Sequence, residues 1–405
     1  MVGLSMVSLV SVSMAGINFG FFIRPMQDSL AINESMFGLA QSARYVGFAV
    51  TSFIIGRIID KFGSRWPLAI VGLIAGALVA CIALIQTGWQ MIAIFFALGL
   101  IGFQGAGGNL YSSVPISRWF HKKRGKAMSA VFLGVPAGIL LTPVIAGLIS
   151  ALGWRLTFVA TGLVGALVIV TISIVVIRRS PDDMGLTIDG GEQSNCDDDQ
   201  NSDNQSSERS WAVREATRNA TFWKLLVIQG CQFIAFGTIV SFRIPYFEDN
   251  GISREIIGLA FSLEAITSVV AAVPAGIALD RFPPRFVGSI SLVILSLAIV
   301  SSMLVIEAWQ VFVATGLFGL GAASGAIVWN TIWPNYFGNQ HIGEIRGRAM
   351  QLMLPAALIG GPLAGYVKDS TGSYIAAWWI AIGLLLFATI TMASTKAPKM
   401  HDAAP

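Results

Sequence analysis

The chain makes a charged turn at Gly56-Arg57-Ile58-Ile59-Asp60-Lys61-Phe62-Gly63-Ser64-Arg65-Trp66, between two long apolar runs. The runs cover residues 37–55 and 67–85. Each approaches the roughly 20 residues that an α-helix needs to cross a bilayer. A turn this polar cannot lie in hydrocarbon, so we expect the chain to leave the membrane here and to enter it again.

The composition of the whole chain agrees with a membrane protein. Of its 405 residues, 55% are apolar and only 12% are charged, whereas soluble domains average about 25% charged residues. Each apolar segment is expected to be a helix, because lipid offers no partner for open backbone groups, and the short alternating segments of a membrane barrel are absent. The fold class is therefore an all-α membrane protein with twelve transmembrane helices, at residues 4–30, 37–57, 66–86, 90–116, 125–150, 155–178, 221–247, 255–279, 285–306, 309–334, 345–367 and 374–394.

Several classes of function are disfavoured by what the sequence lacks. No phosphate-binding Gly-x-x-x-x-Gly-Lys-Ser/Thr motif occurs, so ATP hydrolysis is not the expected energy source. The three cysteines lie far apart in the sequence, and the three histidines are all expected in loops or the tail, so neither residue type shows a metal-ligand spacing. The first segment has no basic residue before Arg24 and no cleavage site after a short apolar core, so we expect it to be retained. We expect no enzymatic activity, no cofactor, no metal and no nucleic-acid partner.

The basic residues indicate the topology. Twenty of the 26 Lys and Arg residues fall in turns or tails on one side of the predicted membrane, and the other side holds only Arg24, Arg155, Arg254 and Lys368. Because cytoplasmic loops carry the excess of Lys and Arg, both termini are predicted to be cytoplasmic. We expect a monomer in a bacterial cytoplasmic membrane.

The sequence repeats itself at half length. Gly56, Asp60 and Arg65 recur 220 residues later as Gly276, Asp280 and Arg285, and the block at 124–128 recurs at 346–350. A polar, acidic tract separates the copies and has too little apolar content to fold alone. The predicted organisation is a six-helix bundle at 1–178, a flexible cytosolic linker at 179–219, a second bundle at 220–395 and a tail at 396–405. Parallel halves of this kind belong to transporters that alternate around a central site.

The turn at residues 56–65, Gly-x-x-x-Asp-Lys-x-Gly-x-Arg, resembles the signature of the major facilitator superfamily. The stretches at 118–127, 153–155 and 336–347 resemble the monocarboxylate and oxalate–formate branch of that superfamily. This resemblance implies secondary active transport. Relatives of this branch carry an arginine inside helix 8, whereas this chain has Glu264 there and no Lys or Arg between 254 and 281. A monoanion or a zwitterion is therefore a better expected substrate than a dianion.

Four ionisable residues are predicted inside the membrane, where each is costly unless it is paired: Arg24, Arg44, Arg243 and Glu264. Arg44 and Glu264 occupy equivalent positions of the two repeats. They could form an ion pair between the halves that breaks during transport. Alternatively, Arg44 binds a substrate carboxylate and Glu264 carries the proton. A static pair, or two side chains that reach for the membrane surface, would be a purely structural explanation.

The remaining candidates lie near helix breaks or small-residue runs. Arg24 and Arg243 lie close to Pro25 and Pro245, which free backbone carbonyls locally, and the branch resemblance implies that the cation of helix 1 handles substrate and proton. Polar and aromatic side chains follow glycine-rich runs in helices 4 and 10 and could line a cavity or merely pack: Asn109, Tyr111, Trp329 and Asn330.

These residues predict a transporter that moves small organic anions, monocarboxylates foremost, by alternating access with a proton. An exporter of hydrophobic or cationic compounds that uses Glu264 for recognition is one alternative. A sensor that binds its ligand without transport is another.

The two signature turns are the predicted gates, formed by Gly56, Asp60, Lys61, Gly63, Arg65, Asp280 and Arg281. Gly63 permits a left-handed turn, whereas Pro283 and Pro284 in the second copy require an extended one. We therefore expect Asp60 to hold the cytoplasmic side closed more strongly than Asp280 does.

Overall fold

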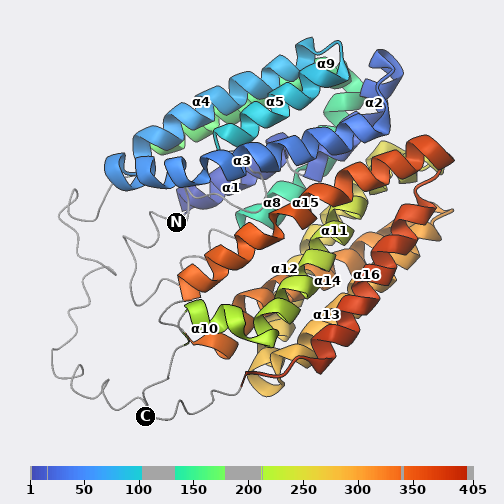
Figure 1. The fold of residues 1–405 in the computed structure, drawn as a ribbon. Coiled ribbons are helices and arrows are strands. Elements are labelled where there is room, and N and C mark those ends of the chain that lie inside the picture. Colours follow the sequence, from blue (N-terminus) through green and yellow to red (C-terminus); the bar gives the residue numbers. More distant parts are fainter. Residues whose placement is uncertain are drawn as a thin grey trace, which may run out of the picture.

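The computed structural model describes residues 2–15, 17–102, 133–177, 211, 213–338 and 342–398. All regular elements in this part of the chain are helices (Figure 1). The first half contains α1 (Val2–Ala15), η1 (Ile17–Phe19), α2 (Gly20–Leu30), α3 (Glu34–Phe62), α4 (Arg65–Cys81), η2 (Ile82–Leu84), α5 (Gly88–Leu100), α8 (Gly134–Leu140) and α9 (Thr142–Val175). The second contains α10 (Val213–Arg218), α11 (Ala220–Asp249), α12 (Arg254–Arg281), α13 (Pro284–Met303), α14 (Ala308–Phe337), α15 (Ile342–Thr371) and α16 (Ile375–Ser394).

The predicted membrane segments correspond to these helices. Eight helices of the described chain are long and apolar enough to cross a membrane. One of these spans, residues 134–175, combines α8 and α9 and holds parts of two predicted segments, because Gly153 with a φ of 75° breaks the helical geometry of α9 between them. The first segment is built from α1, η1 and α2, and the fourth and fifth are described only in part, since residues 103–132 lie outside the described chain. The all-α membrane fold is confirmed, and each of the twelve predicted segments is helical over most of its described residues.

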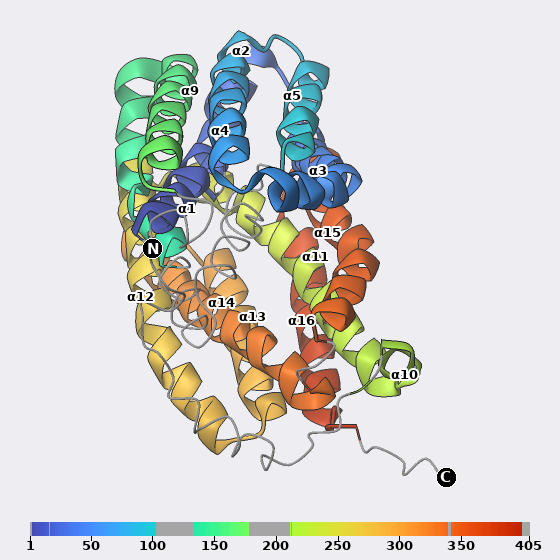
Figure 2. The same ribbon diagram turned by 90° about the vertical axis from the view of Figure 1, so that its left-hand side faces the viewer.

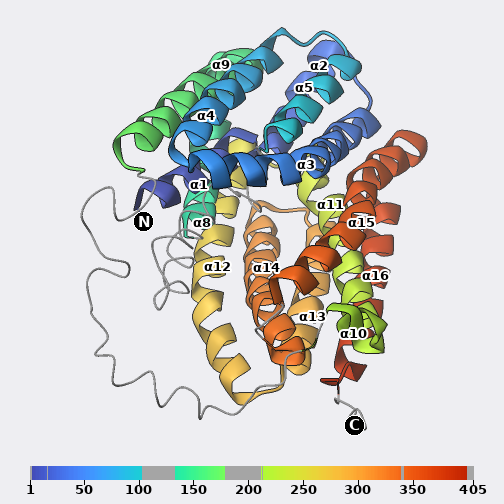
Figure 3. The same ribbon diagram turned by 60° about the vertical axis from the view of Figure 1, so that its left-hand side comes forward.

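The helices form two bundles that meet along a few helix pairs. The first bundle, α1 to α9, lies above the second, α10 to α16, in Figure 3. Figure 2, a quarter turn from the view of Figure 1, shows the same separation. Between the bundles, α3 packs on α15, α12 on α8 and α9, and α2 on α11.

The helices connect at two opposite ends of the molecule. We call the end where α2 leads into α3 and α15 leads into α16 the ion-pair end. The opposite end, where residues 177 and 211 flank the linker, is the linker end. In Figure 1, α3 and α15 lie close together toward the ion-pair end and farther apart toward the linker end.

Close contact between α3 and α15 depends on glycine. A side chain on Gly38 would place its Cβ 2.5 Å from the backbone carbonyl group of Gly361. One on Gly365 would lie 2.6 Å from the Cα of Ser35. The hydroxyl of Ser42 donates a hydrogen bond of 2.7 Å to the carbonyl oxygen of Leu358. Small residues therefore let the two backbones touch, as they do at helix interfaces in membranes.

The two signature turns differ as the sequence predicts. Gly63 has a φ of 74°, in the left-handed region. In the second copy, Phe282 and Pro283 are extended, with ψ values of 148° and 135°. The repeat therefore preserves the order of helices but not the shape of this connection.

Replacing Gly38 with Ala tests the contact between α3 and α15. The added methyl group overlaps the backbone of Gly361, and overpacking of this kind costs about 1–3 kcal/mol, so we expect a lower melting temperature of the purified protein in detergent. The matched control is Gly383→Ala, because a methyl group at Gly383 meets nothing within 4 Å. Equal melting temperatures for the two variants would contradict this close packing.

Candidate functional site

Three of the four predicted intramembrane charges are deeply buried. The exposed fractions are 4% for Arg44, 1% for Arg243 and 3% for Glu264. The side chain of Arg24 is 22% exposed and lies at the ion-pair end. Charges removed from water in this way need partners, because desolvation of a lone charge is very costly.

Arg243 and Glu264 form a two-point ion pair inside the second bundle. Nη1 of Arg243 lies 2.7 Å from Oε2 of Glu264, and Nη2 donates to Oε1 at 2.9 Å. The guanidinium also lies between two phenyl rings, 4.2 Å from the centre of Phe261 and 4.1 Å from that of Phe318. One hydrogen bond, a second ion-pair contact and two aromatic faces together hold this cation in one orientation.

This pair changes one interpretation of the sequence. Glu264 and Arg44 occupy equivalent positions of the repeat, and one of the interpretations above pairs them across the two halves. In the structure Glu264 instead binds Arg243, from the neighbouring helix α11 of its own bundle. The reason is geometric, since α11 and α12 belong to the same bundle, whereas Arg44 lies on α3 of the other bundle.

Arg44 occupies an aromatic environment in the first bundle. Its guanidinium carbon lies 5.9 Å from the ring centre of Tyr45 and 5.9 Å from that of Phe95. Phe95 in turn packs edge-on against Phe19, with ring centres 4.8 Å apart. Arg44 is thus a buried cation surrounded by polarisable rings, on the opposite side of the bundle interface from Arg243.

Another aromatic contact joins the two bundles. Phe21 of α2 packs edge-on against Phe261 of α12, with ring centres 6.0 Å apart. Phe19 and Phe21 are separated by one residue, so the surroundings of Arg44 and of Arg243 meet at the same part of the first helix. Sequence reasoning missed these phenylalanines, because nothing in their spacing distinguishes them from ordinary core residues.

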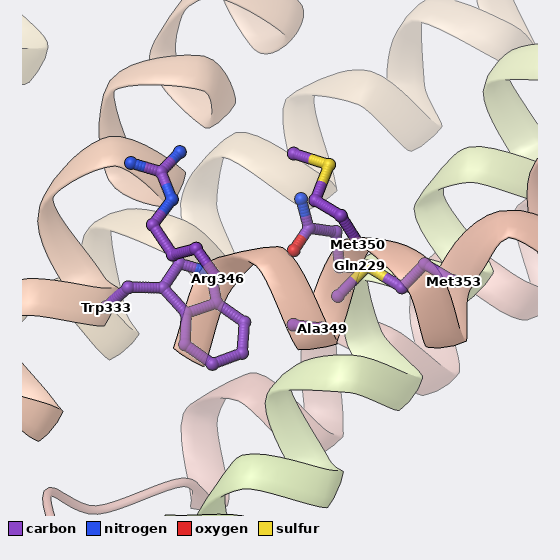
Figure 4. Close-up of a pocket in the computed structure, with 6 residues that line it drawn as sticks. All are labelled: Gln229, Trp333, Arg346, Ala349, Met350 and Met353. Atoms are coloured by element: carbon purple, nitrogen blue, oxygen red, sulfur yellow. The ribbon is translucent and has the colours of Figure 1, made fainter. Parts of the chain in front are cut away.

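The predicted residues of α14 are engaged within the second bundle. The indole N–H of Trp329 donates to Oε1 of Gln232 at 2.5 Å. Oδ1 of Asn330 accepts a hydrogen bond of 3.1 Å from Arg346. Beside them a small cleft opens between α11, α14 and α15 (Figure 4), lined by Gln229, Trp333, Arg346, Ala349, Met350 and Met353. Asn109 and Tyr111 lie outside the described residues.

Arg24 does not line the interior but joins the halves at the ion-pair end. It forms an ion pair with Asp249 of α11, contacts Oε1 of Glu34 at 3.2 Å and donates to Oε1 of Gln27 at 2.8 Å. Lys368 binds Asp249 at 2.9 Å, and Asp369 lies next to it. We call Arg24, Glu34, Asp249, Lys368 and Asp369 the end cluster. Sequence reasoning set its carboxylates aside as loop residues.

The predicted gating residues lie at the linker end. Arg65 donates to the carbonyl oxygen of Ile174 at 2.7 Å, which fastens α4 to α9 within the first bundle. Asp280 and Arg281 are exposed. Gly56, Asp60 and Lys61 belong to α3, and the side chains of Asp60 and Lys61 lie outside the described part of the structure.

Single substitutions in the buried ion pair should destabilise the protein more than the double substitution. Arg243→Gln or Glu264→Gln alone leaves one charge buried without its partner and should lower the free energy of unfolding by about 3–5 kcal/mol. Arg243→Met combined with Glu264→Met should restore most of this loss. Denaturant unfolding in detergent measures all three.

The partly exposed pair of Arg254 with Glu248 provides the control for this double-mutant cycle. Arg254→Gln should cost about 0–1 kcal/mol, as solvent screens such pairs. Additive effects of the Arg243 and Glu264 substitutions would contradict a coupled pair.

Comparisons with known proteins agree with this architecture. The sequence profile described as Major Facilitator Superfamily matches residues 4–248 and 225–404. The chain is 22% identical over 400 residues to the hexuronate transporter of Bacillus subtilis (91% of this chain, 87% of that one). It is 23% identical over 387 residues to mouse monocarboxylate transporter 11 (90% and 78%).

The solved structure of the nucleoside transporter NupG (D323A mutant) has the same fold. It superposes with a TM-score of 0.74 at 13% identity and covers 97% of this chain and 99% of its own. The family match, the twelve helices and the two bundles place this chain among membrane transporters, not enzymes. The chain belongs to the Major Facilitator Superfamily.

Proposed function

We propose that this transporter carries small organic anions, monocarboxylates foremost, together with a proton. The observation that supports it most is the pair of buried guanidinium groups. Away from the end cluster, the buried charged side chains of the described chain are Arg44, Arg243 and Glu264. Two of these three carry a guanidinium group, whose planar fork matches a carboxylate, so the described interior favours an anionic substrate.

The ion pair of Arg243 with Glu264 provides a route for proton coupling. A substrate carboxylate that replaces Glu264 at the guanidinium leaves the Glu264 carboxylate buried and without its partner. A carboxylate in that situation takes up a proton, because burial disfavours its charged form. Binding of the anion and binding of a proton would therefore favour each other.

The position of Arg243 also addresses the departure from the monocarboxylate branch. Helix 8 of this chain lacks the arginine that those relatives carry. The guanidinium of Arg243 comes from helix 7, yet it lies against Phe261 and Glu264 of α12, which is helix 8. A cation in the neighbourhood of helix 8 is thus present, supplied from the adjacent helix.

Two further observations support an anionic substrate. The hexuronate transporter and monocarboxylate transporter 11 are named for carboxylates. The alternative in which Glu264 recognises a cation has less support, because its two oxygens are already bound by Arg243. Trp329, 8% exposed, would supply an apolar wall that discriminates among acids by shape.

The proposal includes an orientation. Because most Lys and Arg residues of the described chain belong to the linker end, this end would face the cytoplasm of a bacterial cell, together with both termini. The ion-pair end would face outward. The proposed domains remain the two bundles at 1–178 and 220–395, joined by the linker at 179–219, in a monomer.

Uptake into proteoliposomes tests the substrate class. We expect labelled monocarboxylates to accumulate in response to an inward proton gradient, and amines not to accumulate. Arg44→Ala and Arg243→Ala should lower uptake by 10- to 100-fold, about 1.4–2.7 kcal/mol. The control is Arg214→Ala, an exposed position of α10. Transport of amines alone would refute the anion proposal, and normal uptake by the Arg44 and Arg243 variants would refute the site.

The two signature turns should differ in their contribution to flux. Asp60→Asn should slow transport severely and Asp280→Asn only mildly, because the turn at Gly63 is left-handed and its counterpart is extended. The measurement is the initial rate of monocarboxylate exchange in proteoliposomes, at matched protein content. Equal effects of the two substitutions would show that the difference in turn shape has no functional meaning.

A further inference from the structure

The end cluster holds the two bundles together through charge. Arg24 and Glu34 belong to the first bundle, and Asp249, Lys368 and Asp369 to the second. The ion pair of Arg24 with Asp249 crosses between the bundles, and Lys368 binds the same carboxylate at 2.9 Å.

Asp369 makes a second crossing contact of a different kind. Its two carboxylate oxygens accept hydrogen bonds from the backbone N–H groups of Glu34 and Ser35, at 3.0 and 2.9 Å. These are the first amides of α3, where an unpaired N–H and the helix dipole both favour a negative charge. The end of α15 thus caps α3 across the bundle interface.

The charges in this cluster do not balance. Arg24 and Lys368 carry two positive charges, whereas Glu34, Asp249 and Asp369 carry three negative ones when all are ionised. The nearby pair of Glu248 with Arg254 is neutral by itself, and the neighbouring Asp28 of α2 is exposed. Among the three acids Glu34 is the buried one, with 3% of its surface exposed.

We propose that Glu34 is a proton-binding site, and that protonation of its carboxyl group favours the conformation in which the bundles meet at the ion-pair end. The proton comes from water and neutralises the excess negative charge of the end cluster. When the bundles separate, Asp249 and Asp369 move away with the second bundle and Glu34 regains water. Its ionised form then becomes favourable again.

Electrostatics supports the same direction. Glu34 precedes the predicted membrane segment 37–57, and burial raises the pKa of its carboxyl group to about 7, although Arg24 and Lys368 lower it. A carboxyl group with a raised pKa stabilises the joined conformation at low pH. This contribution is lost as the pH rises from the ordinary value of 4.5 through 7.

This inference needs only the alternation between two conformations and not the proposed substrate. It also differs in kind from a transported proton. Glu34 lies at the ion-pair end, at the N-terminus of α3, far from Glu264 in sequence and in a different bundle. The proposed role is to make closure of that end depend on pH.

Distance measurements between two spin labels test the proposal. The labels replace Gln86 and Ser370, exposed residues on the two bundles at the ion-pair end, in the full chain with Cys81, Cys196 and Cys231 replaced by Ser. Nanodiscs expose both faces to one pH. Between pH 5 and pH 8 the ratio of separated to joined molecules should rise by roughly 70-fold, as linkage requires for these two pKa values.

The decisive variant is Glu34→Gln, which should remain joined over this range and lose most of the pH dependence. Asp28→Asn, on the same helix as Arg24, is the control and should titrate like the unmodified chain. The proposal would be overturned if the distance between the labels in the unmodified chain did not change with pH. It would also be overturned if this distance still changed with pH in the Glu34→Gln variant.

A second variant keeps the test informative if Glu34→Gln does not fold. Lys368→Gln removes a positive charge from the cluster. The described ion pair of Lys368 is with Asp249 of its own bundle, so the substitution does not remove an ion pair between the bundles. It increases the excess of negative charge, so the midpoint of the transition should move to higher pH. A midpoint that is unchanged or lower would contradict the charge balance on which the proposal depends.

Discussion

The two-point ion pair of Arg243 with Glu264 can open only if something replaces each partner. Two unit charges held in a dry interior attract each other far more strongly than in water, but each has also lost its hydration. Separation therefore demands a substitute anion for the guanidinium and a proton for the carboxylate. A substrate carboxylate and a proton together meet both demands, and this is the physical reason for proposing anion transport with a proton.

The internal repeat explains the backbone of this protein but not its charges. Arg24 has Ile244 as its counterpart 220 residues later, and the counterpart of Arg243 is Ile23. Both isoleucines are fully buried. The two halves have thus kept the same helices and the prolines at 25 and 245, while their cations are one residue out of register and so point from different faces of the helix. One binds Asp249 at the end of the molecule and the other binds Glu264 inside it. The cation of the first half therefore joins the two bundles, whereas the cation of the second half pairs within its own bundle.

Much of the fold could be predicted from the sequence, because lipid permits few alternatives to a helix and polar turns mark its ends. The helix segments, the repeat and the left-handed Gly63 all follow from local rules. The partner of Glu264 does not, since it depends on how far α11 and α12 rotate about their axes. The end cluster was missed for another reason. Its acids lie in or beside loops, where a carboxylate is ordinarily hydrated, and only the approach of the second bundle buries Glu34.

The central pair and the end cluster are linked by single helices. Arg243 and Asp249 both belong to α11, six residues or about 9 Å apart along its axis. Glu34 and Arg44 both belong to α3, about 15 Å apart by the same measure. Pro245 lies between Arg243 and Asp249 and removes one hydrogen bond from the backbone ladder of α11. Because Asp249 binds Arg24 of the other bundle, the single helix α11 carries both a partner of the buried pair and a contact that crosses between the bundles.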